Sequence, residues 1–226
     1  NQNESTASGV TINSVKQNDN TDELSASALV GGETIARVFL DITGTPDGNE
    51  TIEIKPATGI SIFDKAGNAT LTNQTTGVKS LNDLKAPSGH SVSIDDRLLN
   101  NSEKTSASFS FVNAEVGADY SYTISSSGEG TNVTASGTIA TATDQISGID
   151  LSGLSDGTLI LSVVLTDTAG NSAVAVTDTA TLDTTAPIGY SVGIDQSVIN
   201  SSNETSLSFT FADAEVGVTY NYSMKD

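Results

Sequence analysis

The chain has 226 residues and is strongly acidic: 9 Lys and Arg stand against 28 Asp and Glu, for a formal net charge of −19. Because so few basic side chains cannot neutralise many phosphates, we expect no binding to nucleic acid and no attraction to anionic membranes. The chain has no cysteine, which excludes disulfides and thiolate metal sites. No apolar run approaches the roughly 20 residues of a membrane-spanning helix, so we expect no direct membrane insertion.

Alternation of apolar and polar residues predicts β-strands along the whole chain. The segment 105–111 is typical, because Ala107, Phe109 and Phe111 point to one side and serines to the other. The predicted strands are, in chain order, 35–42, 51–55, 105–111, 119–124, 158–166, 173–182 and the segment around 207–211. The 31 Ser and 30 Thr then form a polar outer face with high β propensity, and no segment sustains a helical period. The fold class that we predict is all-β, with tandem antiparallel immunoglobulin-like β-sandwiches.

An internal repeat of 100 residues divides the chain. Residues 86–126 align with 186–226 without a gap, with 20 identities over 41 positions. Shorter similarities link 64–68 to 167–171 and 83–87 to 183–187. We therefore predict three units, namely unit 1 (1–85), unit 2 (86–185) and unit 3 (186–226), the last being the N-terminal part of a further, incomplete repeat. We call 83–87 the first joint and 183–187 the second joint.

Unit 3 is too short to bury a core by itself. Its predicted apolar row of Leu207, Phe209 and Phe211 would be exposed, and we expect it to favour self-association or strand exchange. The other expected partners are neighbouring repeats of the same chain.

The Asp183-Thr184-Thr185-Ala186-Pro187 joint, the Leu165–Asn171 turn and the repeat of about 100 residues resemble the bacterial immunoglobulin-like repeats of large Gram-negative surface adhesins. The resemblance covers nearly all of 86–226 and is weaker over 1–85. It implies an extracellular location on the bacterial cell surface and a part in cell adhesion and biofilm formation. It also implies export by type I secretion, as for RTX adhesins, and a structural role as extender or spacer repeats.

Acidic and amide side chains recur at the expected joints. With immunoglobulin-like topology, Glu115 lies between the second and third strands, and Asp167 and Asn171 lie in a hairpin loop at the same end, where Asp83 arrives from unit 1. Calcium takes six to eight hard oxygen ligands, so we predict a calcium ion (Ca²⁺) that clamps units 1 and 2. Equivalent residues recur at the second joint and at the entrance of unit 1. These are Asp183 and Glu215, and Asp64 and Asn68.

Other interpretations remain open. An Asp-x-Ala-Gly-Asn segment is also a good hairpin turn, and an Asp before a joint can cap a strand end. The single histidine, His90, is expected to be a surface strand residue, and the candidate acids recur at joints, so we expect no enzyme. A ligand-binding module for a glycan or protein, or an accessory immunoglobulin-like module of a secreted enzyme, is the alternative function.

Overall fold

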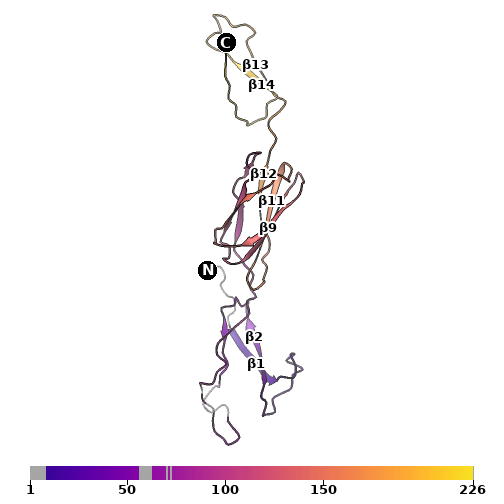
Figure 1. The fold of residues 1–226 in the computed structure, drawn as a ribbon, viewed down its shortest axis with the longest axis vertical. Helices are drawn as coiled ribbons and strands as arrows, with labels where there is room; N and C mark the ends of the chain where they lie inside the picture. The colour runs from indigo at the N-terminus through magenta and orange to yellow at the C-terminus, as the bar shows by residue number, and fades with distance from the viewer. Residues whose placement is uncertain (1–8, 56–62, 70, 72, 226) are drawn as a thin grey trace.

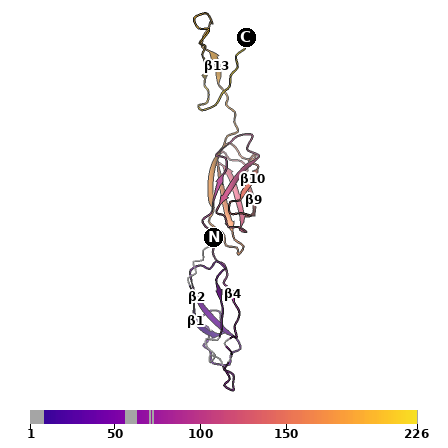
Figure 2. The ribbon, with the colours of Figure 1, turned by 90° about the vertical axis from the view of Figure 1, so that its left-hand side faces the viewer.

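A computed structural model describes residues 9–55, 63–69, 71 and 73–225, and across them the chain is all-β with no helix. The all-β prediction is therefore confirmed. Figures 1 and 2 show the three parts one behind another along the long axis, with unit 1 in indigo and purple, unit 2 in magenta to orange and unit 3 in yellow. No helix that could cross a membrane is found in this described part.

Unit 2 is a sandwich of two sheets. Its strands are β5 (Ser91–Ile94), β6 (Leu98–Leu99), β7 (Ala107–Val112), β8 (Asp119–Ser126), β9 (Val133–Thr138), β10 (Gln145–Ile149), β11 (Gly157–Thr166) and β12 (Val176–Leu182). One sheet has the order β10-β7-β5 and the other β6-β12-β11-β8-β9. All pairs are antiparallel except β6 with β12, which is parallel.

The core of unit 2 follows the sequence alternation. Phe109 and Phe111 on β7 are 0% and 1% exposed, and every second residue of β11 from Leu159 to Leu165 is buried against them. Burying one such side chain contributes about 1.5–3 kcal/mol. The serines that alternate with the apolar residues of β7 face outward, where Ser108 and Ser110 donate hydrogen bonds to the Asp95 carboxylate.

The edges of the two sheets of unit 2 are tied together by Asp178 on β12. Its carboxylate accepts a hydrogen bond from the Ile94 amide at 2.7 Å and another from the Arg97 guanidinium at 2.8 Å. The same guanidinium donates to the Thr179 carbonyl at 2.7 Å. These bonds hold β12 beside β5 and β6.

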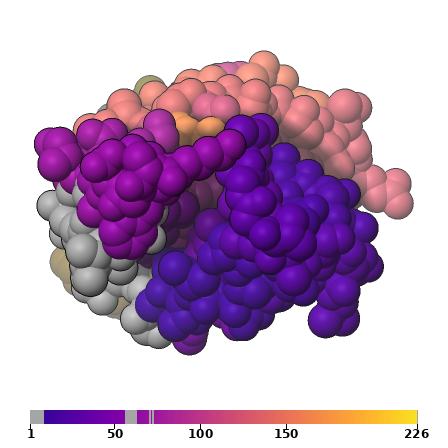
Figure 3. All heavy atoms as spheres, turned by 90° about the horizontal axis from the view of Figure 1, so that it is seen from below, coloured from indigo at the N-terminus to yellow at the C-terminus, as the bar shows by residue number. Residues whose placement is uncertain are grey.

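Unit 1 is built differently. β1 (Gly9–Gln17) pairs with β2 (Ala36–Thr43), and β3 (Thr51–Ile52) pairs with β4 (Lys79–Ser80), each antiparallel. Ala26 and Pro46 are the two apolar residues that are buried among the described residues of this unit. Seen from the end that lies away from unit 2, unit 1 has an indigo lobe and a purple lobe (Figure 3). Of the predicted strand 51–55, only Thr51 and Ile52 form a strand, β3, because only these two residues pair with β4.

Unit 3 repeats the start of unit 2. β13 (Ser191–Ile194) pairs with β14 (Phe209–Ala212) in the register of β5 with β7, shifted by 100 residues. Only this two-stranded sheet is formed in the described part of the unit. Its apolar residues are consequently far more exposed than their equivalents in unit 2.

Candidate functional site at the first joint

The first joint is held by the segment 46–50 of unit 1. The Leu84 amide donates to the Pro46 carbonyl at 3.0 Å, and the Leu81 amide donates to the Glu50 carbonyl at 2.8 Å. Gly48 packs so closely that a Cβ at this position would lie 3.2 Å from the Asp83 Cβ. Gly48 also has a φ of 81°, in the region that favours glycine. The carboxyl-bearing residues 47 and 50 are therefore beside Asp83.

The hairpin loop of unit 2 meets this joint. Asp167 is buried, and its Oδ1 accepts the amides of Ala169 and Asn171 at 2.9 and 2.8 Å. Its Oδ2 accepts the Asn171 side-chain amide at 2.8 Å. The same Asn171 Nδ2 donates to the Asp83 carbonyl at 3.3 Å. One asparagine thus closes the turn and contacts the joint.

Unit 1 contains the same turn in an exposed position. The Asp64 carboxylate accepts the Ala66 amide at 2.9 Å, the Asn68 amide at 2.8 Å and the Asn68 side chain at 2.8 Å. The hydrogen bonds from Asn68 hold the pKa of Asp64 below its ordinary value. The turn interpretation of the Asp-x-Ala-Gly-Asn motif therefore accounts for this geometry in both units, and it uses part of the oxygen lone pairs that a cation would need.

The aspartates of the two joints also cap the chain locally. Asp83 Oδ1 accepts the Lys85 amide at 2.9 Å, and Asp183 Oδ1 accepts the Thr185 amide at 3.1 Å. Such side-chain turns are typical of aspartate at the end of a strand.

The structure brings three of the eight predicted ligand residues together, namely Asp83, Asp167 and Asn171. Glu115 lies in the loop before β8, whose first residue, Asp119, pairs with Thr166 just before Asp167. Asp183 and Glu215 are both exposed and share no hydrogen bond in the described part of the chain; Asp64 and Asn68 lie in the exposed turn of unit 1. Among the described residues, no group of three or more Asp, Glu or His is arranged to hold a metal ion. The calcium ligand set stays a prediction.

Two acids at the first joint were missed by sequence reasoning. Asp47 is buried, and Glu50 Oε2 accepts the Asp47 amide at 3.0 Å. Glu50 Oε1 is buried and has no hydrogen-bond partner among the described residues. The sequence does contain one indication of this site, because the Asp-Gly dipeptide at 47–48 recurs at 156–157.

At the second joint, the aspartate of the recurring Asp-Gly dipeptide accepts hydrogen bonds from residues of the joint itself. Asp156 Oδ1 accepts the Thr184 amide at 2.9 Å and the Thr184 hydroxyl at 2.7 Å, and Oδ2 accepts the Thr185 hydroxyl at 2.7 Å. Hydrogen bonds from Thr185 and Thr184 lower the pKa of Asp156. Asp156 therefore holds the second joint as a negatively charged acceptor.

The prediction that His90 is a surface residue is wrong. His90 follows the first joint and is 9% exposed, and neither ring nitrogen has a hydrogen-bond partner in the described part of the chain. Burial lowers its pKa, because desolvation disfavours the charged imidazolium. Sequence alternation did not reveal this, since His90 precedes the first residue of β5.

These features define an all-β protein in which a β-sandwich, unit 2, is joined end to end with two further β units. No family model matches the chain, and no curated protein matches it. One solved structure, the tetra-tandem repeat in the extending region of a large adhesion protein, is similar with 22% sequence identity and a TM-score of 0.39. The similarity covers 72% of this chain and 42% of that one. The chain thus spans less than half of that structure, and a similarity of this size carries no argument about function.

Proposed function

We propose that the chain is a spacer, formed by extender repeats of a large bacterial cell-surface adhesin and located outside the cell. The observation that carries this proposal is the end-to-end arrangement of the units (Figures 1 and 2), in which Asn171 of unit 2 contacts Asp83 of unit 1 and the segment 46–50 holds the end of unit 1 at the joint. An array whose modules meet at their ends gains length with every module. Such an array would hold an adhesive domain away from the cell and so serve adhesion and biofilm formation. Secretion by a type I system belongs to the same proposal.

We assign no catalytic role to the chain. The candidate acids occupy equivalent turns and joints in successive units, such as Asp64 with Asp167 and Asp83 with Asp183. Their carboxylates accept hydrogen bonds from nearby amides of the same turns. Repetition with local hydrogen bonding is typical of structural positions and not of one catalytic cleft.

Calcium at the joints is a second part of the proposal. Asp47, Glu50 and Asp83 are on adjoining segments, and the buried, unpartnered Glu50 Oε1 supports a cation there. A divalent ion would offset the mutual repulsion of these carboxylates and reduce bending between the units. Asp167 and Asn171 of the turn, together with Glu115 of the neighbouring loop, are the further proposed ligands, and Asp183 with Glu215, and Asp64 with Asn68, are the equivalents at the other positions.

Small-angle X-ray scattering of the full chain, with calcium and then with chelator, tests both parts. We expect calcium to increase the maximum dimension and the melting temperature. We expect Glu50→Gln to weaken both effects, and Glu53→Gln, the same charge change in a glutamate that faces Lys55 and Thr75, to preserve them. Unchanged dimension and melting temperature would refute the calcium part, whereas a compact particle in both conditions would refute the spacer.

Ligand binding separates the spacer from its alternatives. The full chain is tested on a glycan array and on immobilised host proteins, and the spacer predicts no specific signal. Saturable binding of one glycan or protein would instead indicate a ligand-binding module or an accessory module of a secreted enzyme.

A further inference from the structure

Asp156 lies in a part of unit 2 whose backbone is held on both sides by hydrogen bonds. Just before it, the Ser155 carbonyl accepts a hydrogen bond from Ser126 Oγ at 2.7 Å. Just after it, the Thr158 amide donates to Ser127 Oγ at 2.8 Å, and the Ser127 amide donates to the Thr158 carbonyl at 2.9 Å. The turn at the end of β8 therefore fixes the backbone at the start of β11.

Two glycines allow this close approach of the two segments. A Cβ at Gly128 would overlap the carbonyl oxygen of Asp156, and a Cβ at Gly157 would lie 2.7 Å from Ser127 Oγ. Gly157 also has a φ of 151°, in the region that favours glycine. The carboxylate of Asp156 is thus presented to the second joint from a backbone position that unit 2 itself determines.

The Asp156 carboxylate is nearly saturated with donors from the second joint. Its Oδ1 accepts the amide and the hydroxyl of Thr184, and its Oδ2 accepts the hydroxyl of Thr185. A carboxylate offers about four lone-pair sites, so three donors occupy most of them. The nearby positive charge of Lys104 stabilises the same carboxylate. The charged form of Asp156 is therefore stabilised by protein groups alone.

The backbone of the joint itself is also fixed. The Asp183 amide donates to the Leu99 carbonyl at 2.9 Å, the Thr184 amide donates to Asp156, and the Thr185 amide donates to Asp183 Oδ1 at 3.1 Å. Three consecutive amides thus have acceptors within unit 2. Little rotational freedom remains where the chain leaves this unit.

The first joint is not satisfied in this way. The equivalents of Thr184 and Thr185 are Leu84 and Lys85, whose side chains offer no hydroxyl. The buried Glu50 Oε1 beside this joint has no hydrogen-bond partner among the described residues. An acceptor without a donor therefore lies at the first joint, whereas donors and acceptors are matched at the second.

We propose that Asp156, Thr184 and Thr185 form a latch that sets the direction in which the chain leaves unit 2 without the help of a cation. They are positioning residues, and their role rests on the proposed spacer function, because a fixed exit serves an end-to-end array. The two joints then respond differently to calcium, since only the first needs the ion to become stiff. An ion held by Asp183 and Glu215 would meet a joint that is already oriented.

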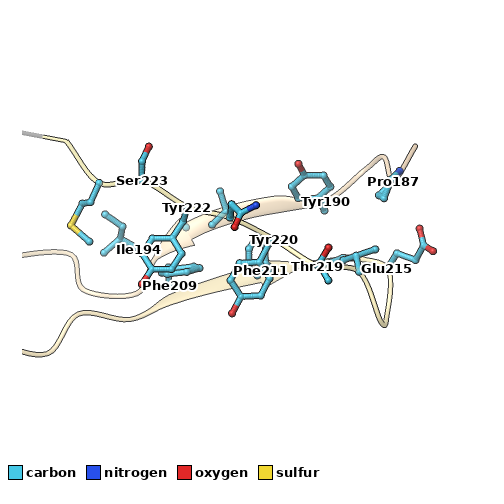
Figure 4. A pocket seen from close by; sticks show the side chains of 16 residues that line it. Pro187, Tyr190, Ile194, Phe209, Phe211, Glu215, Thr219, Tyr220, Tyr222 and Ser223 are labelled. Carbon is cyan, nitrogen blue, oxygen red and sulfur yellow. The ribbon is translucent and has the colours of Figure 1, made fainter. Parts of the chain in front are cut away.

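Two spin labels measure the exit of the chain from unit 2. The full chain has no cysteine, so Thr134→Cys on the edge strand β9 and Ile188→Cys carry the only labels. Ile188 follows Pro187 in the segment that enters unit 3 (Figure 4) and is 83% exposed. Double electron–electron resonance gives the distribution of distances between the labels. We expect one narrow distribution in chelator and the same width with calcium.

Variants of the latch test its parts. Asp156→Ala removes the acceptor of all three hydrogen bonds and should broaden the distribution at least about twofold. Thr184→Val with Thr185→Val should broaden it as well, whereas Thr184→Ser with Thr185→Ser keeps both hydroxyls and should keep it narrow. Asp150→Ala is the matched control, because Asp150 accepts the Ser152 amide in a turn of its own, and it should leave the width unchanged.

Three outcomes would overturn the latch. The first is a broad distribution in chelator that narrows only with calcium. The second is an unchanged width in Asp156→Ala and in the valine variant, which keeps Asp156 and the turn around it. The third is equal broadening by the serine and valine variants, or by Asp150→Ala and Asp156→Ala. The labels report on the second joint alone, so a compact particle in scattering would refute the spacer and leave the latch standing.

Discussion

Asp47 and Asp156 each precede a glycine and lie beside the joint that follows their unit, yet the contacts at the two joints differ. The second joint continues with Thr184 and Thr185, whose hydroxyls donate to the Asp156 carboxylate. The first joint continues with Leu84 and Lys85, which offer no hydroxyl, and there the Pro46 carbonyl accepts the Leu84 amide instead. The same step in the sequence thus gives a charged contact at one joint and a main-chain contact at the other.

Asp156 should titrate below the ordinary aspartate range. Hydrogen bonds from Thr185 and Thr184 lower the pKa of Asp156 in the folded chain. Its contribution to folding stability is therefore complete above the pKa of the unfolded chain, about 3.9, and is lost as the pH falls through the lower pKa of the folded chain. We expect the Thr184 amide resonance to titrate with a midpoint below 3.8. Asp156→Asn should abolish this titration, whereas Asp150→Asn, which removes the charge of an aspartate in an exposed side-chain turn, should not. A midpoint at the ordinary value would contradict the contact.

His90 should make unit 2 sensitive to mild acid. Burial lowers its folded pKa from 6.5, so the unfolded chain takes up a proton first and stability decreases as the pH falls below about 6.5. His90→Phe removes the titration together with two buried, unpartnered ring nitrogens. We expect its melting temperature to exceed that of the wild type, by a margin that widens between pH 7 and pH 5. Parallel curves for the two proteins would show that His90 does not carry the effect.

At the scale of the element, the alternation of apolar and polar residues was sufficient to predict a strand where one of its faces is buried and the other is exposed to solvent. It predicted 105–111, 119–124 and 158–166, which correspond to β7, β8 and β11. It missed β10, because Gly148 and a register irregularity between Ile146 and Ile149 interrupt the period of two. In unit 1 it predicted 35–42, which corresponds to β2, and it missed β1. The predicted strand 51–55 was too long, since almost no apolar residue of the described part is buried there and tertiary packing gives little support to extended structure.

Equivalent phenylalanines on β7 and β14 should differ in their energetic contribution. Phe109 is 0% exposed, so Phe109→Ala should lower the free energy of unfolding of unit 2 by about 3–5 kcal/mol. Phe209 is partly exposed in an uncovered sheet, so Phe209→Ala should cost well under half of that value. Urea titration followed by circular dichroism measures both. Equal losses would mean that unit 3 has a cover in solution.

At the scale of the molecule, the repeat predicted where the joints lie, but the contacts at them required the structure. The sequence placed Asp83 near Asp167 and Asn171 because equivalent loops recur at one end of each unit. It did not indicate Glu50, because its position depends on the pairing of 46–50 with 81–84, two segments that are more than 30 residues apart. It also did not reveal that turn amides occupy much of the Asp167 carboxylate.

The angle between units 1 and 2 should depend on one amide group. Asn171 Nδ2 donates to both the Asp83 carbonyl and the Asp167 carboxylate, so Asn171→Asp replaces a shared donor by a negative charge that faces two acceptors. We expect a smaller average maximum dimension in small-angle scattering, because the joint bends more widely.

Asn68→Asp is the matched control for this prediction. Asn68 makes the same hydrogen bonds to Asp64 in an exposed turn, and among the described residues no hydrogen bond connects it to a joint. Its replacement should therefore disturb the turn to a similar degree and leave the maximum dimension unchanged. If both variants changed the scattering equally, the effect would belong to the turn itself. If neither variant changed the scattering, the contacts of residues 46–50 alone would fix the joint. The unit that precedes each joint would then determine the direction in which the next unit extends.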